Sequence, residues 1–139
     1  MNYKKSNNKI FVKIFKDDFI NEKLLEVAKK EGIKSGWING IGAIKNVEIG
    51  YYDLNAKEYM KKKFKSHYEL VSLIGNISLV NDKPFIHTHI SFSDTEYKMF
   101  GGHLFDAQIT AAGEFFISLS DFSLSRKLNC DIGLALWDI

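Results

Sequence analysis

The first third of the chain changes from a strand-like to a helix-like arrangement of apolar residues. Lys9–Phe15 (KIFVKIF) is rich in β-branched and aromatic residues, which predicts a strand. Apolar residues then recur at helical spacing. Asp17 and Asp18 offer an N-cap before them and Gly32 offers a stop after them. The apolar positions of this segment are Phe19, Ile20, Leu24, Val27 and Ala28. We therefore predict one main helix over residues 18–31.

The remainder of the chain has the pattern of strands separated by turns. Candidate strands cover residues 36–44, 47–53, 58–64, 68–80, 85–92, parts of 107–119, and 133–137. Residues 81–84 (NDKP) and Gly101-Gly102 have the composition of turns. One early helix followed by strands at hairpin spacing predicts an α+β fold, with a largely antiparallel mixed sheet or open barrel of about six to eight strands.

Length and composition indicate a single domain. Residues 1–8 are polar, and we predict that they form a flexible tail before one domain at 9–139. The only cysteine, Cys130, excludes an internal disulfide and fits a reducing compartment. No apolar run approaches the roughly 20 residues of a membrane-spanning helix. We expect a cytoplasmic protein with no membrane partner.

The charge pattern bears on a nucleic-acid partner. The net charge is only +2, and Arg126 is the single arginine. Arginine is the usual side chain for reading base edges, so a sequence-specific DNA binder of this composition would be unusual. Residues 61–65 (KKKFK) form the densest basic run. They could contact phosphates, but a solvated edge strand protected by lysines is the simpler interpretation.

Three of the four histidines fall in one short region. His87 and His89 stand one residue apart in a predicted strand, so their side chains share one face of it. His103 follows the paired glycines, which could let the chain return beside that strand. Hydrogen bonds to neighbouring groups are the alternative role for such histidines. His67, after the lysine run, is interpreted as a surface residue.

The pattern of three histidines favours a metal site. Neutral imidazoles suit Zn²⁺ and, less selectively, other divalent transition metals. Three protein ligands leave a coordination position for water or for a small molecule whose identity the sequence does not reveal. Glu114 lies in an apolar strand segment. It points to solvent in one interpretation, and in the other it is a catalytic acid or base near the metal.

Several motifs together resemble a known family, the plants and prokaryotes conserved (PPC) domain. They are residues 40–43 (GIGA), 50–53 (GYYD), 69–77 (ELVSLIGNI), 84–89 (PFIHTH), 101–104 (GGHL) and the closing 133–139 (GLALWDI). The resemblance spans essentially the whole chain. It implies an antiparallel α+β fold similar to that of α-acetolactate decarboxylase, assembly as a homotrimer, and a metal held by His87, His89 and His103. Plant members add AT-hooks, whose arginine-glycine-arginine core this sequence lacks.

These observations lead to one main functional expectation. We expect a trimeric protein with a three-histidine metal site, zinc or another divalent ion, that supports a lyase-like or decarboxylase-like activity on an unidentified small molecule. The alternative is a DNA-binding or regulatory member of the family that works without an AT-hook. In a third interpretation the metal only stabilises the assembly.

Overall fold

The computed structural model describes all 139 residues and consists of one helix and eight strands. In chain order these are β1 (Asn2–Ser6), β2 (Lys9–Phe15), α1 (Ile20–Lys30), β3 (Gly36–Asp53), β4 (Glu58–Val80), β5 (Lys83–Ser93), β6 (Met99–Leu119), β7 (Arg126–Asn129) and β8 (Leu134–Trp137). The predicted α+β class, the main helix and the strand at residues 9–15 are confirmed. The segments predicted at 36–44 and 47–53 form one long strand, β3, and those at 58–64 and 68–80 form another, β4.

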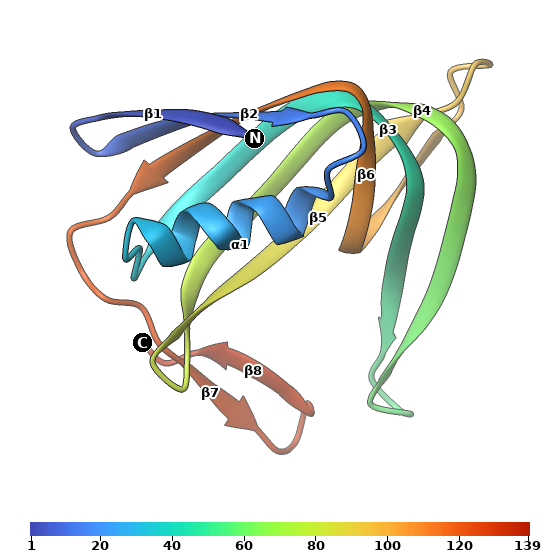
Figure 1. Cartoon of the computed structure of the whole chain (residues 1–139). Coiled ribbons are helices and arrows are strands. Elements are labelled where there is room, and N and C mark those ends of the chain that lie inside the picture. Colours follow the sequence, from blue (N-terminus) through green and yellow to red (C-terminus); the bar gives the residue numbers. More distant parts are fainter.

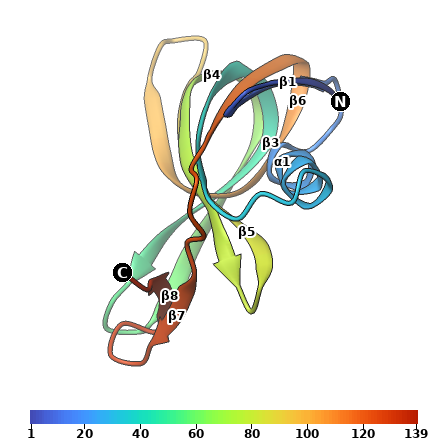
Figure 2. The same cartoon turned by 90° about the vertical axis from the view of Figure 1, so that its left-hand side faces the viewer.

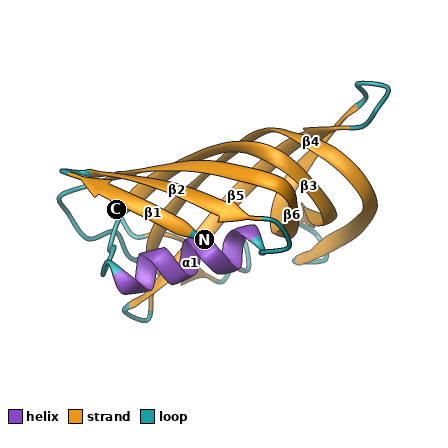
Figure 3. Cartoon of the chain, turned by 45° about the horizontal axis from the view of Figure 1, so that its top comes forward, coloured by secondary structure: helices purple, strands orange, loops and turns teal.

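The larger sheet has six strands in the order β1-β2-β6-β3-β4-β5, and every pairing in it is antiparallel. An additional pairing of β5 with β6 links one edge of the sheet back to its interior. Strands β3 to β6 therefore form a partly closed ring, visible as the curved strands in Figures 1 and 3. Strands β7 and β8 form a separate two-stranded sheet. The predicted antiparallel sheet or open barrel is confirmed.

The helix packs on one side of the sheet, against β5 and β6 (Figure 1). Its predicted apolar stripe is buried, because Ile20, Leu24, Val27 and Ala28 are all 0% exposed. These side chains join inward-facing residues of the sheet in one apolar core. The helix is too short to cross a membrane, and no other helix is present.

The N-terminus of α1 is stabilised differently from the prediction. Phe19 occupies the N-cap position and makes no side-chain capping bond. The backbone amide of Asn21 instead donates to the carboxylate of Asp106 on β6, at 3.0 Å. Asp17 and Asp18 form ion pairs elsewhere, with Lys45 and the N-terminal amine respectively. The predicted role of Gly32 in stopping the helix is confirmed, since Gly32 adopts a φ of +61°, which glycine tolerates best.

Residues 1–8 differ from the flexible tail that we predicted. Residues 2–6 form β1, whose backbone pairs with β2 from Asn2 opposite Lys13 to Ser6 opposite Lys9. Asn7 has a φ of +52° in the turn between the two strands. The strand is mostly exposed, so backbone pairing rather than an apolar pattern specifies it.

Gly101 and Gly102 lie inside β6 and do not form the predicted turn. The chain reverses earlier, between β5 and β6, where the Asp94 carboxylate accepts hydrogen bonds from the backbone amides of Glu96 and Lys98. A Cβ atom on Gly101 would lie 2.7 Å from the carbonyl oxygen of Ile90. Glycine is therefore required because β5 and β6 approach closely here. The turn predicted at residues 81–84 is present but shorter: Asn81 and Asp82 form it, both at positive φ, and β5 begins at Lys83.

The C-terminal hairpin of β7 and β8 lies beside the far end of the β3–β4 hairpin (Figure 2). The hydroxyl of Tyr52 donates to the carbonyl of Ile132 at 2.7 Å, and the Lys57 ammonium donates to the carbonyl of Cys130 at 2.9 Å. These contacts position Arg126, the first residue of β7, near the ring formed by β3 to β6.

Candidate metal centre

His87 and His89 lie on the face of β5 that points away from the apolar core. Alternation along the strand puts Thr88 and Ile90 on the opposite face, where they are 0% and 3% exposed. Thr88 donates from its hydroxyl to the side-chain oxygen of Asn21 on α1, which fixes this part of β5 against the helix. The two imidazoles therefore project from the same face of β5, as their spacing predicted.

The pairing that closes the ring brings the third histidine to the first two. His103 on β6 lies directly opposite His89 on β5. The ring centroids are 5.2 Å apart for His87 and His89, 5.1 Å for His87 and His103, and 5.5 Å for His89 and His103. One nitrogen from each ring lies within 4.8 Å of the others, so the three could hold a metal ion.

Aromatic rings surround the His103 side of this cluster. Tyr59 on β4 stacks on the His103 ring with centroids 4.7 Å apart. The Phe105 ring meets the His103 ring in an edge-on arrangement, with centroids 5.2 Å apart. The Nδ1 atom of His103 is buried and has no hydrogen-bond partner in the protein. Such an atom costs about 1–3 kcal/mol unless a ligand satisfies it. A bound cation would do so, and the residues present therefore fit a metal.

The electrostatics keep two of the imidazoles neutral. Burial lowers the pKa of His87 from 6.5 to about 4, with further contributions from Arg126 and His89. Burial also lowers the pKa of His103 to about 4, assisted by His87, His89 and Lys61. Only a neutral imidazole has a lone pair available for a metal, so both rings are ready to coordinate at neutral pH. His89 is exposed, which leaves this side of the cluster open.

Arg126 contacts the cluster from the C-terminal hairpin. Its Nη2 atom lies 3.4 Å from Nδ1 of His87 and donates to the side-chain oxygen of Asn76 at 2.9 Å. Its Nε atom donates to the hydroxyl of Ser78 at 2.7 Å, and Nη1 donates to the carbonyl of Ala135 at 2.8 Å. In the sequence, Arg126 is distinguished only as the single arginine, and Tyr59 is not distinguished at all. Neither residue carries a local motif that would connect it to the histidines.

A cavity of about 610 Å³ adjoins the cluster. His87, His103, Tyr59 and Arg126 line one part of it. Its other walls include apolar side chains of β5 and β8 and two acids, Glu22 and Asp106. The cluster therefore combines ligands for a metal with space for a small molecule.

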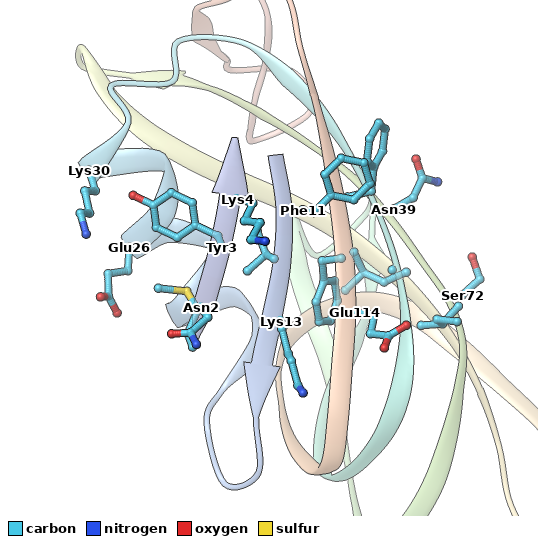
Figure 4. A pocket seen from close by; sticks show the side chains of 17 residues that line it. Asn2, Tyr3, Lys4, Phe11, Lys13, Glu26, Lys30, Asn39, Ser72 and Glu114 are labelled. Atoms are coloured by element: carbon cyan, nitrogen blue, oxygen red, sulfur yellow. The ribbon is translucent and has the colours of Figure 1, made fainter. Parts of the chain in front are cut away.

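Glu114 and His67 do not join the three histidines. Glu114 is exposed near the far end of β6, where it pairs with Ile41 on β3, whereas His103 pairs with Gly50 nine residues further along β3. It lines a different cavity, of about 1270 Å³, which Figure 4 shows. A catalytic role for Glu114 beside the metal therefore has no contact in this chain to support it. His67 is exposed, in agreement with its interpretation as a surface residue.

Comparison with known proteins identifies the family. The model of the Plants and Prokaryotes Conserved (PCC) domain matches residues 1–123. The chain belongs to this PCC family. The predicted resemblance is thereby confirmed, and the PCC domain of this chain contains all three histidines of the cluster. No protein with a curated description matches the sequence.

Two solved structures show how similar other PCC-like proteins are. A proposed DNA-binding protein from Bacteroides thetaiotaomicron is 37% identical, with a TM-score of 0.96, and the match covers 99% of this chain and 96% of that one. A metal-containing protein from Archaeoglobus fulgidus is 34% identical, with a TM-score of 0.85, and the match covers 93% of this chain and 91% of that one.

The expected likeness to acetolactate decarboxylase is confirmed at the level of fold. The Bacillus subtilis enzyme superposes with a TM-score of 0.58 and 16% identity, covering 87% of this chain and 57% of the enzyme. Identity this low carries no information about the substrate of the PCC-domain protein.

Proposed function

We propose that this PCC-domain protein binds a divalent transition-metal ion, Zn²⁺ in the first place, through His87, His89 and His103. The observation that carries the proposal is the convergence of three imidazole nitrogens within 4.8 Å on one side of the β5–β6 ladder. Three neutral nitrogen donors match catalytic zinc sites, which leave a further position for water or substrate. The metal-containing relative from Archaeoglobus fulgidus supports the same proposal.

An enzymatic role on a small molecule is the function that this arrangement supports best. A divalent ion held there would polarise an oxygen of the bound molecule or lower the pKa of a bound water. The adjoining 610 Å³ cavity would hold the remainder of the molecule. A lyase-like or decarboxylase-like reaction fits such a site, because both need an electron-withdrawing centre beside a carbonyl or carboxylate. Glu114 stays a prediction from sequence alone as its acid or base.

Metal analysis of the full chain, purified without a histidine tag, tests the metal proposal. After addition of zinc and dialysis, we expect about one ion per chain in the wild type and less than about a tenth of that in His103→Ala. His67→Ala is the matched control, since it removes an exposed histidine outside the cluster and should keep full occupancy. Wild-type protein that retains no more metal than His103→Ala would overturn the proposal.

We further propose that the protein assembles as a homotrimer in the cytoplasm. An exposed apolar stripe on the outer sheet face supports assembly: Phe11, Trp37, Ile41 and Ile74 are 54%, 44%, 56% and 46% exposed. The single cysteine, Cys130, is free, which fits a reducing compartment. Light scattering should give three times the mass of the chain, and Ile41→Lys should lower that mass. A monomeric wild type would contradict the assembly.

DNA binding is the second candidate, favoured by the proposed DNA-binding relative from Bacteroides thetaiotaomicron. The basic run on β4 gives it limited support, because Lys61 and Lys63 both lie 3.5 Å from the carboxylate of Glu48. Binding through the remaining lysines would weaken steeply with salt. Fluorescence anisotropy with a labelled DNA duplex in low-salt buffer tests for DNA binding. The absence of binding in this buffer would reject DNA binding as a function.

A further inference from the structure

The guanidinium of Arg126 carries a positive charge that no acid of the chain neutralises. None of the ion pairs in the structure includes Arg126. The three groups that accept its hydrogen bonds are the Ser78 hydroxyl, the Ala135 carbonyl and the Asn76 amide oxygen, all uncharged. These contacts orient the guanidinium but leave its full charge available. Burial lowers the pKa of Arg126, so its charge is partly desolvated as well.

Two aromatic rings hold the same group in place. The guanidinium carbon lies 5.2 Å from the centre of the Phe85 ring and 6.0 Å from that of Trp137. Contacts of this kind favour a cation and restrict its motion. A guanidinium has five N–H groups. The longest contact that they make here is Nη2···His87 at 3.4 Å, and one N–H on Nη1 has no partner. Arg126 is therefore a rigid donor with capacity left for a ligand.

The location of Arg126 connects this capacity to the metal cluster. It contacts His87 directly and lines the same 610 Å³ cavity as His87 and His103. A molecule in this cavity therefore lies beside the guanidinium and beside two of the three histidines at once. The unpaired N–H on Nη1 can donate to an oxygen of a carboxylate from a fixed position, whereas the ammonium of a lysine would not be held by the same neighbours.

The remaining walls indicate which anion fits. Apolar side chains of Phe85, Leu134 and Leu136 line the cavity and suit an organic substituent. Glu22 and Asp106 also line it, and their carboxylates would repel an anion with more than one charge. A phosphate dianion would bring two negative charges and no apolar part toward these acids, whereas a monocarboxylate could place its single charge at Arg126 and its apolar part among the leucines.

We propose that Arg126 and the metal together form a binding site for a small organic monocarboxylate, which pairs with the guanidinium and presents an oxygen to the metal. This inference rests on the proposed metal function and specifies its ligand class. It makes Arg126 a binding residue of the site rather than only a link between β7 and β4. The ligand is small because the whole cavity, including the part beside the histidines, measures about 610 Å³.

The test uses the full chain loaded with Co²⁺, whose visible absorption changes when its coordination changes. Pyruvate is the carboxylate probe, inorganic phosphate is the comparison, and metal content is measured in every sample. We expect pyruvate to change the spectrum in a saturable manner and phosphate to bind at least about tenfold more weakly. Arg126→Gln should weaken pyruvate binding at least about tenfold, the usual loss for a hydrogen bond to a charged group.

Three further variants separate binding from folding. Arg126→Lys keeps the charge but not the fixed N–H groups of the guanidinium, and should lose several-fold in affinity, which tests the inference even if Arg126→Gln fails to fold. Ser78→Ala removes one hydrogen bond of Arg126 at 2.7 Å but not its charge, and should keep most of the binding. Lys63→Gln removes an exposed cation of β4 that is already paired with Glu48, and should leave binding within about twofold.

The outcomes distinguish the two proposals. Protein that takes up no metal overturns the proposed function, and this inference with it. Protein that holds metal but shows no response to pyruvate overturns the inference alone, as does Arg126→Gln with metal and unchanged pyruvate affinity. Phosphate that binds as tightly as pyruvate also contradicts the assignment to a monocarboxylate.

Discussion

His89 and His103 lie directly opposite each other in the β5–β6 ladder, with ring centroids 5.5 Å apart. This ladder is also the pairing that links the edge of the sheet back to its interior. The contact that closes the ring is therefore the same contact that assembles the three histidines. Changes that separate β5 from β6 should disturb the proposed metal site even when they touch no histidine.

Gly101→Val tests this coupling. A Cβ atom at Gly101 would lie 2.7 Å from the carbonyl oxygen of Ile90, a backbone atom that can move only with its strand. We expect the strands to separate near His103 and zinc affinity to fall at least about tenfold, as measured by competition with a chromophoric chelator.

Gly32→Ala is the matched control for lost stability. Gly32 has a φ of +61° and open space around its Cβ position, so alanine there is strained but lies outside the site. It should lower the free energy of unfolding by about 1 kcal/mol while zinc affinity stays unchanged. Equal losses of zinc affinity in both glycine variants would show that the ladder has no specific role.

Zinc should stabilise the folded chain against heat. A ligand that binds only the native state at 100 times its dissociation constant adds about 2.7 kcal/mol to the free energy of unfolding. We expect differential scanning calorimetry to show a higher Tm with zinc in the wild type and in His67→Ala, and no shift in His89→Ala. A zinc-dependent shift that survives in His89→Ala would mean that the metal binds elsewhere.

The metal-free protein should lose stability in mild acid. The pKa of His87 and of His103 is about 4 in the folded chain, compared with the ordinary 6.5. Between these values the unfolded chain binds more protons, so stability is complete above pH 6.5 and declines as pH falls toward 4. A double variant, His87→Gln with His103→Gln, should show a flatter dependence of Tm on pH. An unchanged pH dependence in that variant would contradict the assigned pKa values.

Much of the fold was predictable because its core elements have local patterns. The strand at residues 9–15 and the helix that ends just before Gly32 follow from periodicity and end signals alone. The first strand was missed because its side chains are mostly exposed and only its pairing with Lys9–Phe15 specifies it. The helix start was missed because its amide partner, Asp106, lies 85 residues away in sequence.

In the candidate site, too, residues placed by local sequence patterns could be predicted and residues placed by distant contacts could not. His87 and His89 could be predicted because strand alternation is local, and His103 because it is close in sequence. Arg126 and Tyr59 contact the histidines through the C-terminal hairpin and through β4, and no short-range pattern records such contacts. Glu114 stays a prediction from sequence alone, because the composition of its segment does not record which side of the sheet it faces or how far along β6 it lies from His103.

Tyr59 offers a last test of how the site holds its ligands. Its ring stacks on His103 with centroids 4.7 Å apart and an interplanar angle of 28°. Tyr59→Ala would expose the imidazole to water and free its rotation. We expect zinc affinity to fall several-fold, and the pKa of His103 in the metal-free protein to rise above about 4 as burial is lost.

Tyr59→Phe keeps the ring and should behave as the wild type in both respects, because the stacking surface and not the hydroxyl restrains His103. Chelator competition gives the affinities, and an NMR titration of the histidine ring protons gives the pKa. If Tyr59→Ala bound zinc as tightly as Tyr59→Phe, the orientation of His103 would depend only on its backbone pairing with His89. The Tyr59 ring would then serve only to exclude water.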